Sequence, residues 1–398
     1  MKKVAIVGFG TVGVGVAEIL ERNRDSIAKK AGEELELAYV VDLRDMPESP
    51  FADKMVKDFA LVENDPEVSI VVEAIGGCGA ALMFVTRALK AGKSVVTSNK
   101  QLVAEHGRAL IRLAKENGCN FLFEASVGGG IPLLHPLNRC LAGNILTDVT
   151  GILNGTTNYI LTQMLEEGAE YEGALKRAQE LGYAEANPAA DVEGIDAGRK
   201  VCILSDLAFG KNVSPENVSM QGITKIEAVD AKFAESAGMK IKLFGRTCIR
   251  DGKQYAFVSP FFVPESYLLS HVSDVFNAVS VKGSDIGEAI FYGPGAGRYP
   301  TASAVVGDII DITANPGRVQ PAWWEEDEAE LADPKTFRAP FFFRTKCSRD
   351  EAEKALGMQV RWLPEQNGCR GGLTAVTSLA EIEAGGLQFD ACWPVYDG

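Results

Sequence analysis

The sequence is poor in histidine, with three in 398 residues, and its eight cysteines form no C-x-x-C pair. It therefore lacks paired-cysteine zinc motifs and the H-E-x-x-H pattern of metalloproteases. Scattered cysteines in a chain of this size are typical of reduced thiols, so we expect a cytoplasmic protein without a disulfide framework. These absences disfavour metallohydrolase and serine-hydrolase chemistry.

The sequence also lacks an apolar run of about 18 residues, so we expect no transmembrane helix. Glycines interrupt its apolar start and Glu18 follows, which disfavours a signal peptide. Positive charge is in deficit: 40 Lys and Arg against 54 Asp and Glu give a net charge of −14, which disfavours nucleic-acid and anionic-membrane partners. With 46% hydrophobic and 24% charged residues, the composition is that of a globular protein with room for two or three domains.

Short apolar segments alternate with helical patterns over the first 125 residues. The strand-like segments are continuous apolar runs, which is typical of strands buried on both faces of a sheet. We predict an α/β fold with a doubly wound parallel sheet. The predicted strands cover residues 4–7, 35–41, 69–74, 94–97 and 120–124, and helices at residues 80–91 and 101–117 separate the last three.

From about residue 131 the pattern changes to mixed helices and antiparallel strands, which predicts an α+β second domain. Asp251-Gly252 predicts a hairpin turn between two of its strands. The predicted helices cover residues 131–142, 158–167, 171–181 and 196–209, and the strands cover 148–153, 240–249, 255–263 and 278–281. We place the domains at residues 1–130, completed by a helix at about 298–320, at 131–297, and at 331–398, a small C-terminal α+β module that follows an acidic linker at 325–330.

The first predicted strand runs into a glycine-rich turn that opens a helix. Gly8, Gly10 and Gly13 have the spacing G-x-G-x-x-G, in which the glycines allow a tight turn, close approach of a pyrophosphate, and close packing of helix on strand. The N–H groups at the start of the helix would bind the phosphates. Asp42 ends the second strand, where a carboxylate binds the ribose 2′-hydroxyl of NAD, whereas Arg44 suits the 2′-phosphate of NADP. The sequence therefore predicts a dinucleotide site and leaves the choice of nucleotide open.

Polar side chains follow the fourth and fifth predicted strands, at the sheet edge where doubly wound folds bind ligands. Thr97-Ser98-Asn99-Lys100 ends one strand, and a lysine there would face the nicotinamide and the substrate. Glu124 ends the next strand and precedes a glycine-rich loop, whose carbonyl oxygens can coordinate a cation. An exposed lysine and a solvated or helix-capping acid are the simpler alternatives for Lys100 and Glu124.

Residues 182–200 carry several acids before a buried helix. Asp196 and Lys200 are four residues apart and share one helix face. A lone pair of this kind is usually an exposed ion pair of little energy. Here the helix continues into the apolar residues 201–204, and carboxylates at 185, 191 and 193 precede it. Buried carboxylates beside a lysine suit a polar, cationic substrate and proton transfer, so we predict a catalytic centre here.

Together these segments resemble the homoserine dehydrogenase family. The matching stretches follow the family's order over residues 1 to about 315, and those at 151–160 and 182–200 are the most specific. The stretches are 8–13 (GFGTVG), 96–100 (VTSNK), 124–132 (EASVGGGIP), 151–160 (GILNGTTNYI), 182–200 and 292–297 (YGPGAG).

The resemblance implies an NAD(P)-dependent oxidoreductase that interconverts L-homoserine and L-aspartate 4-semialdehyde, in the aspartate route to threonine, methionine and isoleucine. It implies a Rossmann-type nucleotide-binding domain, a domain for substrate binding and dimerisation, and a homodimer or homotetramer.

The resemblance also implies roles for individual residues. Lys200 matches the family's proton donor and acceptor, and Lys100 and Asp196 join it in the catalytic group. The implied substrate-binding residues are Glu185, Asp196, Asp191, Lys100, Gly155, Thr156 and Tyr183. The implied cofactor-binding residues are Gly8, Phe9, Gly10, Thr11, Val12, Gly13, Asp42, Arg44, Thr97, Ser98, Lys100, Gly182 and Gly297. A monovalent cation, Na⁺ or K⁺, is implied at Glu124, Val127, Gly129 and Ile131.

The C-terminal end departs from the family pattern. Many relatives carry a regulatory domain of the ACT type, whereas about 65 residues remain here. Residues 341–345 and 348–356 fit its first strand and helix, and a small packing or oligomerisation module is the alternative.

Other functions are weighed against this interpretation. One alternative is a dehydrogenase of another small amino-acid substrate. Another is an inactive dinucleotide sensor, which would not need Lys200. An aspartate-semialdehyde dehydrogenase is disfavoured, because no cysteine stands in an activating motif.

Overall fold

The computed structural model describes residues 1–319, 324 and 327–398. The chain forms two compact units, each built from three separate segments. The first comprises Met1–Gly143, Asp206–Ser214 and Gly293–Glu328, and the second comprises Asn144–Ser205, Pro215–Tyr292 and Ala329–Gly398.

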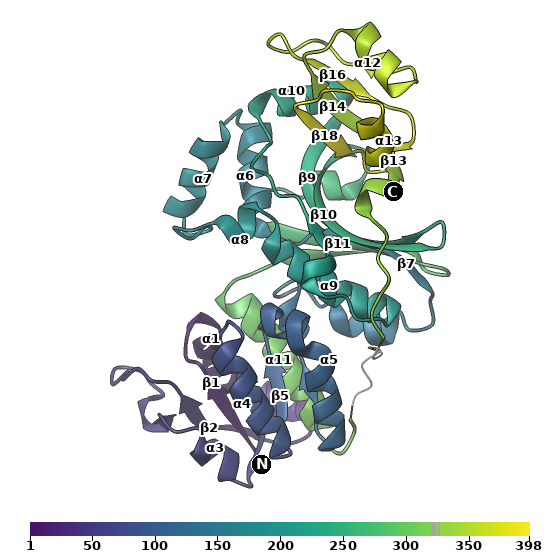
Figure 1. The fold of residues 1–398 in the computed structure, drawn as a ribbon. Helices are drawn as coiled ribbons and strands as arrows, with labels where there is room; N and C mark the ends of the chain where they lie inside the picture. The colour runs from purple at the N-terminus through teal and green to yellow at the C-terminus, as the bar shows by residue number, and fades with distance from the viewer. Residues whose placement is uncertain (320–323, 325–326) are drawn as a thin grey trace. The chain divides into compact units, whose positions relative to one another are not determined.

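The first unit is built on a six-stranded parallel sheet (Figure 1). The strand order is β3-β2-β1-β4-β5-β6, so the winding of the chain reverses between β1 and β4. This is the order of Rossmann dinucleotide-binding domains, and it confirms the predicted doubly wound sheet. The strands are β1 (Lys2–Val7), β2 (Leu35–Val41), β3 (Met55–Val56), β4 (Val68–Glu73), β5 (Ser94–Thr97) and β6 (Phe121–Leu122).

Helix α11 returns from late in the sequence to complete the first unit. Val16 and Leu20 on α1 share one apolar core with Val305 and Ile309 on α11. The two helices approach closely at Gly15, where a Cβ atom would lie 2.9 Å from the carbonyl oxygen of Arg298. The helices of this unit are α1 (Thr11–Arg22), α2 (Arg24–Ala31), α3 (Ala60–Asn64), α4 (Gly79–Lys90), α5 (Lys100–Glu116) and α11 (Arg298–Ala314).

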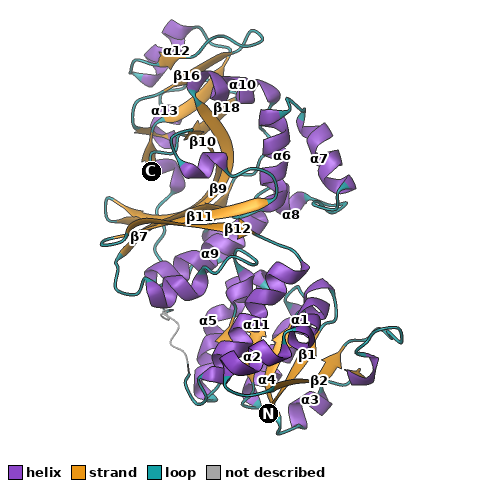
Figure 2. Ribbon diagram, turned by 180° about the vertical axis from the view of Figure 1, so that it is seen from behind, coloured by secondary structure: helices purple, strands orange, loops and turns teal. Residues whose placement is uncertain are grey.

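The second unit contains a mixed six-stranded sheet in the order β12-β11-β7-β9-β10-β8 (Figure 2). Its long hairpin β9–β10 turns at Asp251 and Gly252, whose φ angles of 53° and 73° are those of a type I′ turn. The predicted hairpin is therefore confirmed. The strands are β7 (Leu146–Ile152), β8 (Ser219–Met220), β9 (Met239–Arg250), β10 (Lys253–Pro264), β11 (Phe276–Gly283) and β12 (Gly287–Pro294).

Several elements differ from the sequence-based prediction. The predicted helix at 131–142 is wrong at its start: helical structure begins at residue 134, with a π-helical turn over Pro136–Cys140. Strand β12 and helix α10 were not predicted. The helices of the second unit are α6 (Gly155–Glu166), α7 (Tyr171–Glu180), α8 (Ala189–Val192), α9 (Ile195–Phe209), which ends in the first unit, and α10 (Ala228–Ala237).

The C-terminal segment forms a four-stranded antiparallel sheet in the order β15-β16-β14-β18. Its β-α-β-β-α-β sequence of elements is that of a ferredoxin-like fold. The elements are β14 (Phe341–Thr345), α12 (Arg349–Leu356), β15 (Arg361–Trp362), β16 (Arg370–Leu373), α13 (Leu379–Ala384) and β18 (Ala391–Pro394), and a small ladder pairs β13 (Arg338–Ala339) with β17 (Thr377–Ser378).

This C-terminal segment shares its core with the β9–β10 hairpin. The rings of Phe342 and Phe262 stack with centroids 4.0 Å apart, and Tyr396 meets Phe244 edge to face. Of the predicted acidic linker, Glu325 and Glu326 lie outside the described residues. Glu328 pairs with Arg108 of the first unit at 3.1 Å, so this part of the stretch makes specific contacts.

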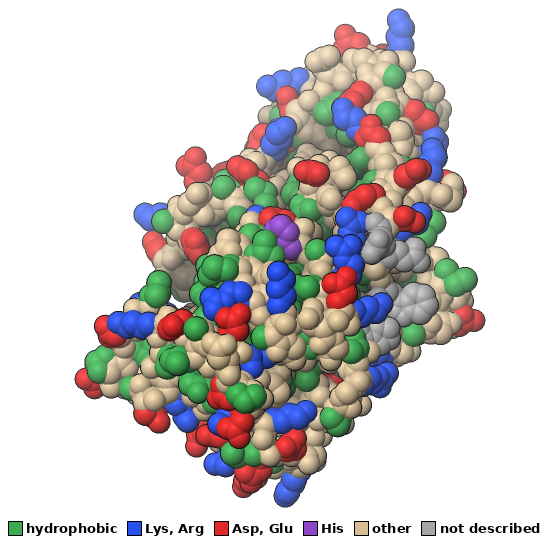
Figure 3. All heavy atoms as spheres, turned by 60° about the horizontal axis from the view of Figure 1, so that its bottom comes forward, with side chains coloured by type: hydrophobic (Ala, Val, Ile, Leu, Met, Phe, Trp, Pro, Cys, Tyr) green, Lys and Arg blue, Asp and Glu red, His purple; other side chains and the backbone are tan. Residues whose placement is uncertain are grey.

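Acidic and basic side chains are interspersed on the face of the molecule in Figure 3. Over the described ranges, helices fall short of the length and apolar character that a bilayer crossing requires.

Candidate active site

The turn between β1 and α1 has the geometry of a pyrophosphate cradle. Gly8 has φ of +94°, a conformation that favours glycine. At Gly13 a Cβ atom would lie 2.1 Å from the carbonyl oxygen of Gly8, so any side chain here would push the helix off the strand. At Gly10, by contrast, a Cβ would meet no atom within 4 Å, which leaves open space above the backbone. Thr11 and Val12 follow in the first turn of α1, whose first N–H groups are not capped by the Gly10 position and suit a phosphate. The residues present therefore fit a dinucleotide.

Asp42 and Arg44 are placed together where β2 ends. The Arg44 guanidinium donates hydrogen bonds to both carboxylate oxygens of Asp42, at 2.9 and 2.8 Å. The backbone N–H of Phe9 donates to the same carboxylate at 2.8 Å, which ties the acid to the glycine turn. The hydrogen bonds from Arg44 hold the pKa of Asp42 well below its usual range. The acid thus stays ionised, with its charge balanced by an exposed arginine.

Lys100 is held at the start of α5 by a network at the carboxyl ends of β4 and β5. The hydroxyl of Thr97 donates to the buried Glu73 carboxylate at 2.6 Å, and the N–H of Asn99 donates to the Thr97 oxygen at 2.9 Å. Asn99 in turn caps the helix through the N–H of Leu102. Ser98 is half-buried beside this network. Sequence reasoning missed Glu73, although a carboxylate at the end of the third predicted strand is the signal that could have found it.

Glu124 lies deep in the first unit and binds backbone amides. Its carboxylate accepts the N–H groups of Leu133 at 2.5 Å, Leu134 at 2.9 Å and His135 at 2.6 Å. These bonds explain why the predicted helix starts late: the carboxylate draws these amides towards itself. Val127, Gly129 and Ile131 lie on the intervening loop, which packs closely enough that a Cβ at Gly129 would fall 2.4 Å from the carbonyl oxygen of Gly295.

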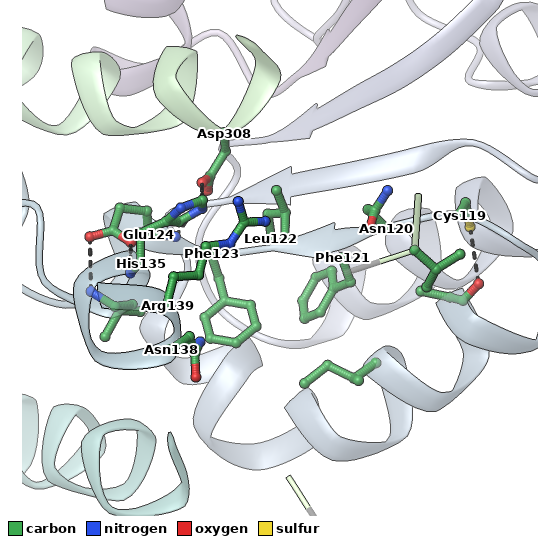
Figure 4. Close-up of a pocket in the computed structure, with 14 residues that line it drawn as sticks. Cys119, Asn120, Phe121, Leu122, Phe123, Glu124, His135, Asn138, Arg139 and Asp308 are labelled. Atoms are coloured by element: carbon green, nitrogen blue, oxygen red, sulfur yellow. Dashed lines mark hydrogen bonds and ion pairs between the residues drawn. The ribbon is translucent and has the colours of Figure 1, made fainter. Parts of the chain in front are cut away.

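A second acid accompanies Glu124 in a small pocket (Figure 4). Asp308 on α11 accepts the N–H of Glu124 at 3.0 Å and lies 3.3 Å from the His135 ring. Burial, and secondarily the Asp308 charge, raise the pKa of Glu124. Burial likewise raises the pKa of Asp308, and the hydrogen bond to Asp308 raises the pKa of His135. The Asp308 carboxylate thus favours the protonated form of the His135 ring, a pairing that the sequence did not indicate.

In the second unit, Lys200 is buried beside Asp196 on α9. Their side chains are only 9% and 7% exposed, and the ammonium lies 2.7 Å from the carboxylate. The ammonium also donates to the carbonyl oxygen of Leu153 at 2.6 Å, at the end of β7. Two fixed acceptors therefore set the position of Nζ. The predicted burial of this pair is confirmed, and the exposed ion pair that was its alternative is excluded.

Asn154 joins this lysine pair to Asp191. Its side-chain amide donates to Asp196 at 2.9 Å and to Asp191 at 2.7 Å. Its side-chain oxygen accepts the N–H of Thr157, so the same residue caps α6. In the sequence, Asn154 stands out only as part of the stretch 151–160. Its contacts with two acids could not be predicted, because they depend on the tertiary structure.

The remaining predicted substrate residues surround the start of α6. Gly155 packs so closely that a Cβ would lie 2.6 Å from the carbonyl oxygen of Val275. The Thr156 hydroxyl donates to the carbonyl oxygen of Tyr183 at 2.6 Å. The residue before Tyr183, Gly182, has a left-handed backbone conformation. Glu185 is exposed, and its carbonyl oxygen accepts a hydrogen bond from Gln179.

The structure distributes the predicted site residues over both units. The first holds the glycine turn, the Asp42–Arg44 pair, Lys100, the Glu124 loop and Gly297, and the second holds the Lys200 cluster with Gly155, Thr156, Gly182, Tyr183 and Glu185. Within the second unit, Asp191, Asp196 and Lys200 are brought together around Asn154, whereas Glu185 is exposed and contacts Gln179.

Comparisons with known proteins match both the nucleotide-binding residues and the residues around Lys200 to one family. Residues 132–310 match the family model for homoserine dehydrogenase, and residues 8–124 match the model for its NAD-binding domain. The homoserine dehydrogenase of Bacillus subtilis is 42% identical over 319 residues, 79% of this chain and 73% of that protein. That of Helicobacter pylori is 38% identical over 372 residues, 92% of this chain and 87% of that protein.

Solved structures extend the likeness to the whole chain. A crystal structure of a homoserine dehydrogenase from Thiobacillus denitrificans has a TM-score of 0.91 at 33% identity, covering 100% of this chain and 98% of that one. A hyperthermophilic archaeal homoserine dehydrogenase mutant, solved in complex with NADPH, has a TM-score of 0.67 at 31% identity, covering 79% of this chain and 98% of that one. The chain belongs to the homoserine dehydrogenase family.

Proposed function

We propose that this chain interconverts L-homoserine and L-aspartate 4-semialdehyde with NAD(P), and that Lys200 transfers the proton to and from the reacting oxygen. The observation that carries the proposal is the buried contact of Lys200 with Asp196 and the Leu153 carbonyl. These two contacts fix the position of an ammonium that can donate a proton to a bound substrate.

The reaction places definite demands on these side chains. The nicotinamide, when bound, supplies or accepts the hydride. As the aldehyde is reduced, negative charge grows on its oxygen, and Lys200 donates a proton there to give the alcohol. In the reverse direction Lys200 accepts the hydroxyl proton. Asp196 and Asn154 act as positioning residues, because they fix the lysine before the substrate arrives.

The proposed substrate contacts follow from charge. Glu185 and Asp191 would attract the substrate ammonium, with Gly155, Thr156 and Tyr183 shaping the wall of that site. Lys100 would offer its ammonium at the junction of substrate and nicotinamide. The side-chain amide of Asn154 donates to Asp191 at 2.7 Å, which holds this acid beside the Lys200 cluster.

The cofactor contacts are also part of the proposal. The glycine turn would hold the pyrophosphate, with Phe9, Thr11 and Val12 supplying the adjoining backbone. Asp42 and Arg44 would read the adenosine ribose. Thr97, Ser98, Gly182 and Gly297 would lie on the nicotinamide side.

We propose further that a monovalent cation, Na⁺ or K⁺, binds the loop after Glu124. The Glu124 carboxylate already accepts three backbone N–H groups, so its side chain is a poor fit for a cation ligand in this arrangement. The carbonyl oxygens of residues 127, 129 and 131 are hard donors of the kind such ions prefer, and they remain the better ligand set.

Four finer features complete the proposal. The protein would be a homodimer or homotetramer and act in the cytoplasm. It would serve the route from aspartate to threonine, methionine and isoleucine. The net charge of −14 supports the absence of nucleic-acid and membrane partners.

The experiment is homoserine-dependent reduction of NAD and NADP by Lys200→Arg and Lys200→Met. Arginine preserves the charge beside Asp196 but does not release a proton near neutral pH. We expect both variants to lower kcat by about 10²–10⁴-fold while nucleotide binding persists. The control is Lys176→Met, which removes an exposed lysine of α7 and should leave turnover unchanged.

Near-normal turnover in Lys200→Arg would remove Lys200 from the mechanism. Activity of the wild type with other amino-acid alcohols but not homoserine would overturn the substrate assignment.

Running the assay with Na⁺, K⁺ or a bulky organic cation tests the cation loop. Light scattering of the same preparation gives the oligomer size.

A further inference from the structure

A thiol, an imidazole and a carboxylate converge on the first unit, apart from the residues assigned above. Cys78 immediately precedes α4, and Glu105 and His106 lie on the neighbouring helix α5. One ligand atom from each lies within 4.8 Å of the other two. Among the residues that the structure describes, these three form the group of histidine, cysteine and acidic side chains whose ligand atoms lie this close together.

We propose that Cys78, Glu105 and His106 bind one divalent ion of the Zn²⁺ type. Tetrahedral zinc takes a thiolate at ~2.3 Å and nitrogen or oxygen at ~2.0–2.2 Å, which places ligand atoms about 3.5 Å apart. The Cys78 sulfur and Glu105 Oε2 are already 3.2 Å apart. The remaining separations are at most 4.8 Å, so binding would require them to close by about 1 Å.

The charges of the three groups also match such an ion. A thiolate and a carboxylate carry two negative charges, and a neutral imidazole adds none, so the bound site would be electrically neutral. Sulfur and nitrogen ligands select Zn²⁺ and similar ions over Mg²⁺ and Ca²⁺, which prefer oxygen. Binding displaces the thiol proton, which now lies towards Glu105, and releases it to solvent.

The ion would join two parts of the nucleotide-binding unit. Cys78 follows Gly77, whose carbonyl oxygen accepts a 2.6 Å hydrogen bond from the side chain of Asn99. Asn99 caps α5, which begins at Lys100 and carries both other ligands. An occupied site would therefore restrain the turn after β4 against the helix that carries Lys100. Half-exposed positions for Cys78 and His106 leave the site open to ions from solvent and to a water as fourth ligand.

The test is titration of the full chain, reduced and free of chelators, with Co²⁺ as a spectroscopic probe and Zn²⁺ as competitor. We expect one Co²⁺ per chain and a thiolate-to-cobalt charge-transfer band in the near ultraviolet, which one equivalent of Zn²⁺ abolishes. Cys78→Ser should eliminate the band. His106→Gln and Glu105→Gln should each weaken binding at least about tenfold, since loss of even an outer partner has that effect.

Cys369→Ser and His271→Gln serve as matched controls, because they remove a half-exposed thiol and an exposed imidazole elsewhere. Both should bind Co²⁺ as the wild type does. Thermal melting with and without Zn²⁺ adds a second readout, in which only the wild type and these controls should be stabilised. Absence of the band, or its persistence in Cys78→Ser, would overturn the proposal whatever the enzymatic activity.

Discussion

Asp42 and Arg44 are the pair of residues from which we predict a nucleotide preference. An unpaired carboxylate at the end of β2 would repel a 2′-phosphate. Here the Arg44 guanidinium already balances the Asp42 charge, and its side chain remains 60% exposed, so it can also reach a phosphate. We therefore expect the protein to prefer NADP over NAD.

Arg44→Ala should reverse this preference. Loss of a charge-assisted hydrogen bond of about 1.5–3 kcal/mol lowers kcat/KM with NADP by about 10–100-fold. The value with NAD should change little, because Asp42 then accepts the ribose hydroxyl without competition. Steady-state kinetics with both nucleotides measures the effect. Arg24→Ala, at an exposed arginine of α2, is the control, and an equal loss with both nucleotides would contradict the assignment.

Contacts within the candidate site could be predicted from the sequence only between residues that are close together in the chain. Asp196 and Lys200 are one helical turn apart, so their contact follows from the helix alone. Asn154 is 42 residues from Asp196, and the coupling between Glu124 and Asp308 spans 184 residues. Such contacts depend on how strands and helices pack, which no local pattern contains.

At the scale of elements, the turn from β1 into α1 separates two roles of glycine. Gly13 allows the helix to touch the strand, whereas Gly10 leaves space for a ligand. The two demands look alike in the sequence motif, but in the structure they have opposite surroundings.

Substitution by alanine should distinguish the two glycines. Gly13→Ala would force α1 away from β1, so we expect both a lower Tm and weaker nucleotide binding. Gly10→Ala has room in the free protein and an extended backbone at φ of −82°, so we expect an unchanged Tm but weaker nucleotide binding. Thermal melting and fluorescence titration with NADPH measure the two effects. Equal stability losses in both variants would disprove this division.

Elements with regular apolar patterns were predicted closely, and those without were missed. Strand β5 occupies the predicted residues 94–97, because Val95 and Val96 at its centre are apolar and all four residues are buried. Strand β12 has a short apolar run at residues 289–292, but glycines lie near both ends of the strand and most of its residues are exposed or half-buried. Helix α10 begins with a capping box that uses Glu227 in place of serine or threonine, which conceals its start.

At the scale of the molecule, the C-terminal segment is part of the second unit's core. Its buried aromatic residues Phe341, Phe343 and Tyr396 belong to one cluster with Phe244 and Phe261 of the hairpin. The sequence-based boundaries of this module, residues 331–398, stay a prediction. Its hydrophobic contacts nevertheless couple its unfolding to that of the β9–β10 sheet.

Phe342→Ala should therefore destabilise the second unit as a whole. Phe342 is fully buried between Phe262 and Trp393, and its truncation should cost about 3–5 kcal/mol of unfolding free energy. Urea unfolding followed by tryptophan fluorescence and by residual activity should give coincident transitions, both at lower urea. Leu268→Ala, at a 69% exposed position, is the control. An early fluorescence transition with activity retained would show that the segment unfolds alone.

The route of the chain through α11 has a consequence for synthesis on the ribosome. The strands of the parallel sheet are complete by Leu122, but the helix that covers the apolar side of α1 begins only at Arg298. At about 5–20 residues per second, the nascent sheet waits on the order of ten seconds or more for that helix. During this interval the apolar face of α1 is exposed to chaperones, so the nucleotide-binding unit matures only after most of the polypeptide has been translated.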